Sequence, residues 1–165
     1  MFNIVLVEPE IPQNTGNIAR TCAATGCRLH LAGKLGFELS DKYLKRAGLD
    51  YWQFVDVKTW KSFDELVEAY PGGNYYFFTT KAKKCYTDAK YCEGDFLVFG
   101  KETKGLPEEL LKAHSESCVR IPMMGDLRSL NLSNSAAIAI YEGLRQTGFE
   151  CMNLKGELHN LKWED

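Results

Sequence analysis

Residues 120–142 read RIPMMGDLRSLNLSNSAAIAIYE, and this stretch is the clearest indication of the fold. A short apolar strand is predicted at residues 118–121. The strand ends at Pro122, because proline fixes φ and has no N–H group to donate to a neighbouring strand. A polar loop follows, and a run of small and apolar side chains then predicts a helix over residues 133–146. A strand, a polar loop and a helix in this order are typical of α/β proteins.

The start of this helix allows two interpretations. Ser133 and Asn134 are preferred N-cap residues, because their side chains accept hydrogen bonds from the unpaired N–H groups of the first turn. Capping explains these two residues but not the polar crowding of the preceding loop. That loop contains Asp126, Arg128, Ser129 and Asn131. Arginine and asparagine beside a helix N-terminus suit an anionic or polar ligand, so the loop is a candidate site.

The body of the helix is apolar on every side. Residues 136–141 read AAIAIY and offer no polar face over nearly two turns. A helix with this pattern is typically buried, either within its own chain or between two chains. The pattern alone does not separate these two kinds of burial.

Apolar runs alternate with helical patterns along the rest of the chain. Strands are predicted at residues 2–7, 28–32, 53–57, 75–80 and 95–99. Helices are predicted at residues 14–25, 40–47 and 62–70, and a further helix begins at Pro107. This alternation predicts an α/β fold with a mainly parallel sheet and helices on both faces. At 165 residues the chain is expected to form a single domain (1–165), with residues 151–165 as a peripheral tail.

Composition limits the class of protein. Apolar residues make up 45% and charged residues 25% of the chain, which is ordinary for a soluble globular protein. The formal net charge is −2, so an RNA partner would need local basic clusters. One candidate cluster comprises Lys42, Lys45 and Arg46. Residues 81–93 mix lysines with tyrosines, which suits RNA, although a solvated loop with its rings on the core is the simpler interpretation.

Localisation and metal binding are also limited by the sequence. The N-terminus lacks the basic start of a signal peptide, and no apolar run approaches membrane-spanning length, so no membrane association is expected. The six cysteines form no C-x-x-C pair and the three histidines are scattered, so no metal site is predicted. Reduced thiols and a cytoplasmic location are the expected consequence.

Three polar loops follow predicted strands and are expected to form one site. They comprise residues 8–17, 100–106 and 122–134. Ligands of parallel α/β sheets bind beyond the carboxyl ends of the strands, so the three loops should converge there. Glycines on both sides of Glu102 favour a fixed acceptor in this site over a solvated charge. Dinucleotide-binding, P-loop and serine-hydrolase motifs do not occur in the sequence.

The motifs in these loops resemble those of a known enzyme class. Residues 14–20 read NTGNIAR, residues 99–107 read FGKETKGLP, and IPM at 121–123 is followed by SLNLSNSA at 129–136. In this order and at these spacings they resemble the three motifs of the SPOUT-class RNA 2′-O-ribose methyltransferases. The short length, EPEIP at 8–12 and RAGLDY at 46–51 are similar to the small subgroup that methylates the wobble ribose of tRNA.

The resemblance implies an S-adenosylmethionine-dependent enzyme that methylates the ribose 2′-OH of tRNA nucleotide 34, either cytidine or uridine, and releases S-adenosylhomocysteine. Its partner would be the tRNA anticodon stem-loop. The resemblance also implies a C-terminal trefoil knot and a homodimer, in which Arg20 works beside the cofactor held by the other subunit.

The resemblance further implies which residues form the site. The cofactor pocket is matched, largely through backbone groups, by Phe78, Gly100, Ile121, Ser129 and Leu130. The catalytic motif positions are matched by Arg20, Asn14, Glu102 and Asn131. Two roles for Arg20 stay open. It could accept the 2′-OH proton, although a guanidinium group is nearly always charged, or it could stay charged, hold a phosphate and stabilise the developing oxyanion.

Two other functions are compatible with the sequence. One is a related 2′-O-methyltransferase that acts on another tRNA position or on ribosomal RNA, and the lack of an appended RNA-binding domain argues against it. The other is a non-catalytic RNA-binding protein on the same fold, and the intact polar loops argue against it.

Overall fold

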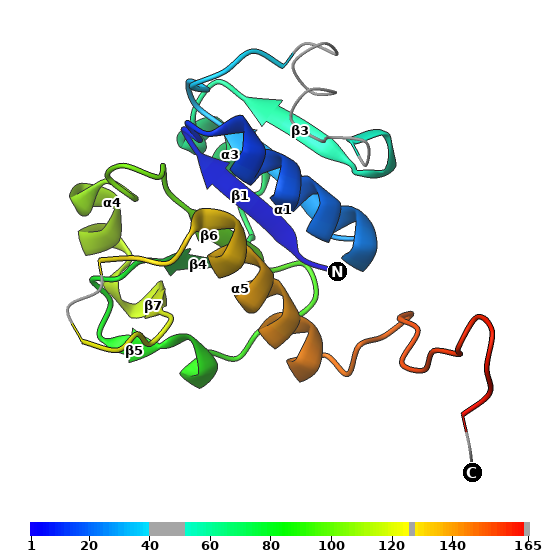
Figure 1. Cartoon of the computed structure of the whole chain (residues 1–165). Helices are drawn as coiled ribbons and strands as arrows, with labels where there is room; N and C mark the ends of the chain where they lie inside the picture. Colours follow the sequence, from blue (N-terminus) through cyan, green and yellow to red (C-terminus); the bar gives the residue numbers. More distant parts are fainter. Residues whose placement is uncertain (40–51, 126–127, 164–165) are drawn as a thin grey trace.

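The computed structural model describes residues 1–39, 52–125 and 128–163. Within these residues seven strands form one sheet (Figure 1). The strands are β1 (Asn3–Val7), β2 (Arg28–Ala32), β3 (Val57–Trp60), β4 (Tyr75–Phe78), β5 (Lys84–Cys85), β6 (Phe96–Phe99) and β7 (Cys118–Arg120). Their order is β3-β2-β1-β6-β4-β7-β5, and every pairing between them is parallel. The loops after the strands therefore meet at one edge of the sheet.

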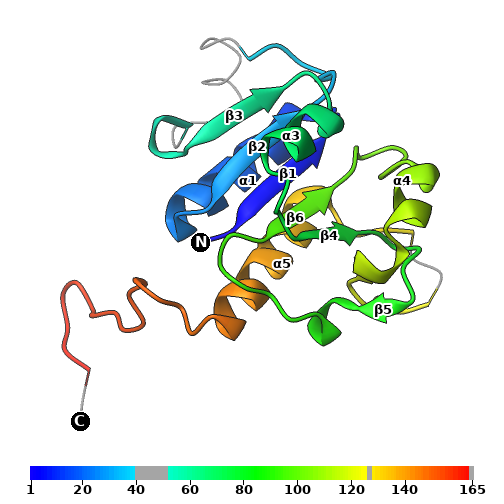
Figure 2. The same cartoon turned by 180° about the vertical axis from the view of Figure 1, so that it is seen from behind.

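Helices cover both faces of the sheet (Figure 1, Figure 2). They are α1 (Pro12–Thr25), α3 (Phe63–Ala69), α4 (Glu108–Ala113) and α5 (Leu132–Gln146). Successive side chains of a strand point to opposite faces. In β1, Ile4 and Leu6 join the core beneath α1 and α5, whereas Val5 and Val7 join the core beneath α3 and α4. The predicted α/β class, with a parallel sheet and helices on both faces, is confirmed.

One predicted strand is misplaced. The sequence predicts a strand at residues 53–57, but Trp52–Phe54 form a single 3-10 turn and β3 begins at Val57. The side chain of Phe54 is 68% exposed, so an apolar residue that looks like a core residue in the sequence faces solvent. The helix predicted at residues 40–47, with its basic cluster, lies outside the described residues.

The N-cap of α5 differs from the prediction. Asn131 caps the helix, because its Oδ1 accepts hydrogen bonds from the N–H groups of Ser133 at 2.9 Å and Asn134 at 3.4 Å. The prediction that Ser133 and Asn134 are the caps is wrong, since both already lie in the first turn. The capping chemistry is the expected one, but it comes from the preceding loop.

α5 is buried on one side only. Ala136, Ala139 and Ile140 are fully buried, whereas Ile138 is 36% and Tyr141 is 46% exposed. The apolar run is therefore not enclosed by its own chain. Contacts within the chain therefore bury one side of α5 and leave the side with Ile138 and Tyr141 partly exposed.

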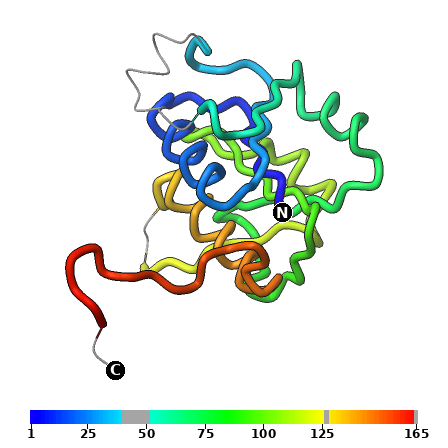
Figure 3. Tube along the Cα trace, turned by 90° about the vertical axis from the view of Figure 1, so that its right-hand side faces the viewer, coloured from blue at the N-terminus to red at the C-terminus, as the bar shows by residue number. Residues whose placement is uncertain are grey.

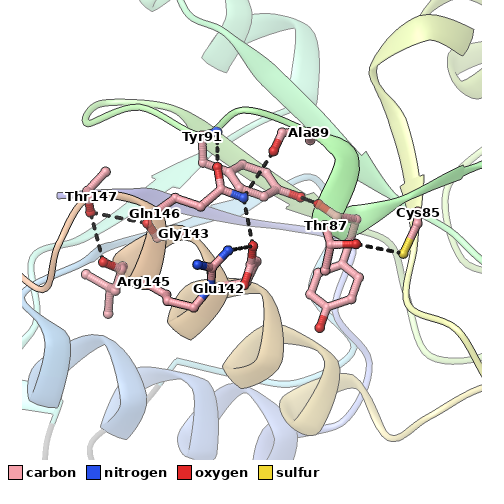
Figure 4. A network of polar contacts seen from close by, with 11 residues as sticks. Cys85, Thr87, Ala89, Tyr91, Glu142, Gly143, Arg145, Gln146 and Thr147 are labelled. Atoms are coloured by element: carbon pink, nitrogen blue, oxygen red, sulfur yellow. Dashed lines mark hydrogen bonds and ion pairs between the residues drawn. The ribbon is translucent and has the colours of Figure 1, made fainter.

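The tyrosines of residues 81–93 pack on the core. Tyr91 is only 4% exposed, and its OH group donates to the carbonyl of Tyr86 at 2.7 Å. Gln146 of α5 holds the same segment, because its Nε2 donates to the carbonyl of Ala89 at 3.1 Å and its Oε1 accepts from the N–H of Tyr91 at 3.0 Å (Figure 4). Tyr91 is therefore closed to base stacking, and Tyr86 is partly buried against the same core. The simpler interpretation holds for the placement of these rings on the core.

Residues 152–163 contain no helix or strand and extend away from the sheet (Figure 1, Figure 3). Their apolar side chains are open to solvent, with Leu161 74% and Trp163 67% exposed. Among the described residues no helix is long and apolar enough to cross a membrane. Strand order does not define how the chain is threaded, so the trefoil knot stays a prediction.

Candidate functional site

A pocket of about 570 Å³ opens at the carboxyl ends of β4, β6 and β7. Its walls are residues 78–81 at the end of β4, residues 99–106 at the end of β6, and Ile121, Met123 and residues 128–132 after β7, with Ile11 and Asn14 from the start of α1. The three polar loops converge as the sequence predicts, because parallel strands end at the same edge. A volume of this size is within the range of small-molecule sites.

All five predicted cofactor-binding residues line this pocket. They are Phe78, Gly100, Ile121, Ser129 and Leu130. The ring of Phe78 stacks on that of Phe99, with centroids 4.8 Å apart and planes 19° apart, which fixes the apolar floor. The lining thus combines aromatic and aliphatic side chains with the backbone groups of two loops. This composition suits a ligand that has both a flat ring and polar groups.

Gly100 is required by the loop itself. A Cβ atom built at Gly100 would lie 2.1 Å from the carbonyl carbon of Gly105 and 2.2 Å from the nitrogen of Leu106. The loop closes on itself through the N–H of Gly105, which donates to the carbonyl of Lys101 at 2.8 Å. The space that a side chain at Gly100 would need is therefore filled by the chain's own backbone.

Three of the four predicted catalytic residues form one hydrogen-bonded chain. Asn14 Nδ2 donates to Glu102 Oε1 at 3.0 Å, and Asn131 Nδ2 donates to Asn14 Oδ1 at 3.0 Å. Asn131 Oδ1 then accepts from the N–H of Ser133, at 2.9 Å, and from its hydroxyl at 2.7 Å. Each amide donates at one end and accepts at the other, so the orientation of both amides is fixed by their neighbours.

Glu102 is a fixed acceptor, as the sequence predicts. Its Oε2 accepts from the N–H of Glu10 at 2.8 Å, and its Oε1 accepts from the N–H of Ile11 at 3.2 Å. Ile11 is the N-cap of α1 and offers no side-chain cap of its own. A carboxylate from a loop 91 residues away along the chain therefore caps α1, and the positive end of the helix dipole favours its charge.

A second set of contacts between the same loops escaped the sequence interpretation. Glu10 Oε2 accepts from the N–H of Thr103 at 3.1 Å and from its hydroxyl at 2.8 Å. Lys101 Nζ pairs with Glu8 Oε2 at 2.6 Å, and this ion pair raises the pKa of Lys101. These four residues and Glu102 brace the loop after β1 against the loop after β6. The only signal in the sequence was opposite charge just after two strands that pair in the sheet.

Arg20 is separated from the other catalytic candidates. It lies on the exposed side of α1, six residues beyond Asn14, and it is not part of the pocket lining. Six residues along an α-helix correspond to a rotation of roughly 240°, so Asn14 and Arg20 point to different sides. Within one protomer, the pocket and the hydrogen-bonded residues therefore lie on one side of α1, and Arg20 lies on another side.

Among the described residues, no group of three or more His, Cys, Asp or Glu side chains is placed to hold a metal ion. The six cysteines, all within this part, are free thiols. Burial raises the pKa of the Cys22 thiol well above its usual range, so this cysteine is a core residue and not a nucleophile.

Comparisons with known proteins agree with this geometry. A family model described as "SpoU rRNA Methylase family" matches residues 1–141. A tRNA (cytidine(34)-2′-O)-methyltransferase from Saccharophagus degradans is 51% identical over 150 residues, which cover 90% of this chain and 97% of the relative. A solved structure described as "Structural insights into the 2-OH methylation of C/U34 on tRNA" superposes with a TM-score of 0.85 at 47% identity, over 91% of this chain and 98% of the other.

A third similarity concerns a structure that contains a cofactor. The SpoU methyltransferase AviRb from Streptomyces viridochromogenes, solved in complex with AdoMet, superposes with a TM-score of 0.78 at 25% identity. The superposition covers 89% of this chain and 60% of AviRb.

Proposed function

This chain belongs to the SpoU rRNA methylase family, and from that premise we propose that it methylates the ribose 2′-OH of nucleotide 34, cytidine or uridine, in tRNA. The methyl donor is S-adenosylmethionine, and S-adenosylhomocysteine is released. Relatives named for this reaction match nine tenths of the chain at about half identity. The observation that carries the proposal is that the three loop motifs shared with this enzyme class line one pocket.

The pocket fits S-adenosylmethionine. Phe78, Ile121 and Leu130 provide apolar surface for an adenine ring, and the backbone of residues 100–106 and 129–132 provides hydrogen-bonding groups. When bound, the cofactor supplies an electrophilic methyl group on a sulfonium. We assign Phe78, Gly100, Ile121, Ser129 and Leu130 to cofactor binding on this basis.

We assign Glu102, Asn14 and Asn131 to positioning. The carboxylate of Glu102 already accepts three hydrogen bonds from α1 and its cap, so its lone pairs are directed at the protein. Amide side chains do not take up protons at neutral pH, so neither asparagine suits the removal of the 2′-OH proton. The chain of hydrogen bonds instead fixes α1 relative to α5 beside the pocket.

Arg20 is our candidate for the group that contacts the substrate. A guanidinium is charged at neutral pH and offers a fork of donors that matches phosphate and a developing oxyanion. We therefore propose that Arg20 acts as a clamp. Because Arg20 lies outside the pocket of its own chain, this role needs a second copy whose α1 faces the pocket. The half-exposed apolar side of α5, with Ile138 and Tyr141, supports a homodimer in which that side is covered.

Three further assignments rest on the family and not on the geometry. We propose a C-terminal trefoil knot around the pocket loops, a single domain over residues 1–165 with a peripheral tail at 151–165, and a cytoplasmic location where tRNA is available. The tRNA contact is assigned to the anticodon stem-loop, because nucleotide 34 lies in its loop.

The test is a nucleoside assay. The purified protein is incubated with S-adenosylmethionine and tRNA transcripts that differ only at nucleotide 34, and the digested nucleosides are identified by mass spectrometry. We expect 2′-O-methylcytidine or 2′-O-methyluridine from transcripts with a pyrimidine at this position and none from matched purine transcripts. Methylation of ribosomal RNA, or of tRNA at another position, would replace the proposed substrate.

A further inference from the structure

A second hollow, of about 660 Å³, lies beside the cofactor pocket. Residues 79–84 form one wall, and α4 with the turn that follows it forms the other. Four lysines and two glutamates line it: Lys81, Lys83, Lys84, Lys112, Glu108 and Glu116. We call this hollow the lysine groove. Its charged lining sums to +2 in a chain whose total is −2, so positive charge is concentrated here.

Most of this charge is not neutralised by the protein. Lys81 pairs with Glu108 at 2.6 Å. Lys83, Lys84 and Lys112 are exposed, and none of them takes part in an ion pair between described residues. Exposed lysines on a concave surface attract a polyanion, because each phosphate that binds releases a condensed counterion.

The backbone beneath these lysines is ordered. Lys84 belongs to β5, which pairs with β7 at Val119. Upstream, Ala82 is 8% exposed, and its N–H donates to the carbonyl of Thr79 at 3.4 Å. Downstream, the segment is held on the core by Tyr91 and Gln146 (Figure 4). A ligand that binds the lysines therefore orders side-chain tips and not a loop, which lowers the entropic cost of binding.

The lysine groove is adjacent to the cofactor pocket. Thr79 and Lys81 line both hollows, so the two share these residues as a common border. A nucleotide whose ribose reaches the pocket must have its neighbouring phosphates just outside it. The lysine groove is a basic surface at that position, next to the pocket's own Lys104 and Arg128.

We propose that the lysine groove binds the sugar-phosphate backbone of the tRNA anticodon arm whose nucleotide 34 enters the pocket. The inference rests on the proposed function and adds the surface that recognises the substrate. An acidic protein partner is also negatively charged, but it would not explain why the groove borders the methyl-transfer pocket. Tyr91 takes no part, since it is buried in the core.

The test compares two double variants that lose the same charge. Lys83→Gln with Lys84→Gln removes two lysines from one wall, and Lys81 is kept because it also lines the cofactor pocket. Lys61→Gln with Lys155→Gln is the control, since Lys61 follows β3 at the opposite end of the sheet and Lys155 lies in the tail. Binding of a fluorescent tRNA with cytidine 34 is measured between about 50 and 200 mM KCl, a range over which affinity that depends on phosphate contacts falls steeply.

We expect the groove variant to bind tRNA about tenfold more weakly at physiological salt, with a salt slope smaller by about 1.4 to 1.8 for two lost phosphate contacts. In methyl transfer, KM for tRNA should rise more than kcat falls. Calorimetric affinity for S-adenosylhomocysteine should be retained, which shows that the variant is folded. The control variant should match the wild type in tRNA affinity and slope.

Two results would overturn the assignment. One is a groove variant whose tRNA affinity and salt slope equal those of the control while the wild type methylates nucleotide 34. The other is an equal loss in both double variants, which would mean that total charge and not the groove governs binding. If the wild type methylates no tRNA at all, the proposed function fails and the groove assignment fails with it, so the two failures are distinguishable.

Discussion

Replacing Glu102 with glutamine keeps the shape of the side chain but converts one acceptor oxygen into a donor. Both oxygens of Glu102 face N–H groups: Oε2 accepts from Glu10, and Oε1 accepts from Ile11 and Asn14. The amide NH₂ of glutamine must therefore oppose at least one of these donors. The less costly orientation places it at the Oε2 position, where the N–H of Glu10 loses its partner.

The expected loss follows from this geometry. A hydrogen bond to a charged acceptor contributes about 1.5 to 3 kcal/mol. The charge of a carboxylate near a helix N-terminus contributes a further amount of about 0.3 to 1 kcal/mol. Glu102 is half-buried, and water can replace part of what is lost. We therefore expect Glu102→Gln to lower the free energy of unfolding by about 2 kcal/mol, or the melting temperature by about 4 to 8 °C for a chain of this size.

Thermal and urea unfolding, followed by circular dichroism, measure this change. Glu68→Gln is the matched control, since Glu68 is exposed on α3 and should leave the unfolding free energy unchanged. A double-mutant cycle with Asn14→Ala tests the contact itself, and we expect a coupling energy of at least about 0.5 kcal/mol. If Glu102→Gln unfolds like the control but turnover falls by orders of magnitude, Glu102 acts on the substrate and the positioning role is refuted.

Three other predictions follow from the site and the core. Arg20→Ala should lower turnover by a factor of about 10² to 10³ or more. If the site is shared across a dimer, an equal mixture of the Arg20→Ala and Asn131→Ala proteins should recover up to about a quarter of wild-type activity, because half of the dimers would be heterodimers with one intact site. No recovery in the mixture would place Arg20 in the site of its own chain. Asn131→Asp should keep the helix cap but lose the Nδ2 donor to Asn14, so we expect the free energy of unfolding to fall by about 1 kcal/mol and turnover to fall with it. Unchanged turnover would exclude that bond from the mechanism. Burial lowers the pKa of His30 to about 4. The stabilisation should be fully present above about pH 6.5, and the free energy of unfolding should fall by up to about 3 kcal/mol as the pH drops toward 4, because the unfolded chain takes up the proton first. Unfolding of His30→Gln should depend less on pH, and an equal pH dependence in the two proteins would contradict this reasoning.

The centre of the fold could be predicted because its signals are local. β1 is buried on both faces, so its sequence is a continuous apolar run, and the strand before Pro122 and the helix after it have the same clarity. β3 lies at one end of the sheet and pairs only with β2. Its residues are mostly half-buried, so it lacks an apolar run, and the exposed Phe54 shifted the prediction toward the preceding turn.

The site could be predicted only in part, because its contacts are of two kinds. Residues with a recognisable motif were found, and three of the four catalytic candidates meet in one hydrogen-bonded chain. Two contacts join residues that are 93 positions apart in the sequence: Glu10 with Thr103 and Glu8 with Lys101. No periodicity or local spacing in the sequence predicts such pairs. A trefoil knot is likewise a property of threading, which patterns of single elements do not encode.

Asn131 shows why capping and function are not alternatives at this helix. Its Oδ1 caps α5, and its Nδ2 donates to Asn14 on α1. The amide can serve both ends because a cap needs only an acceptor, which leaves the NH₂ group with a fixed direction. An aspartate or serine would cap as well, but neither would present that donor while capping. An asparagine cap therefore offers a donor that capping alone does not need. In this chain that donor joins α5 to Asn14 of the site.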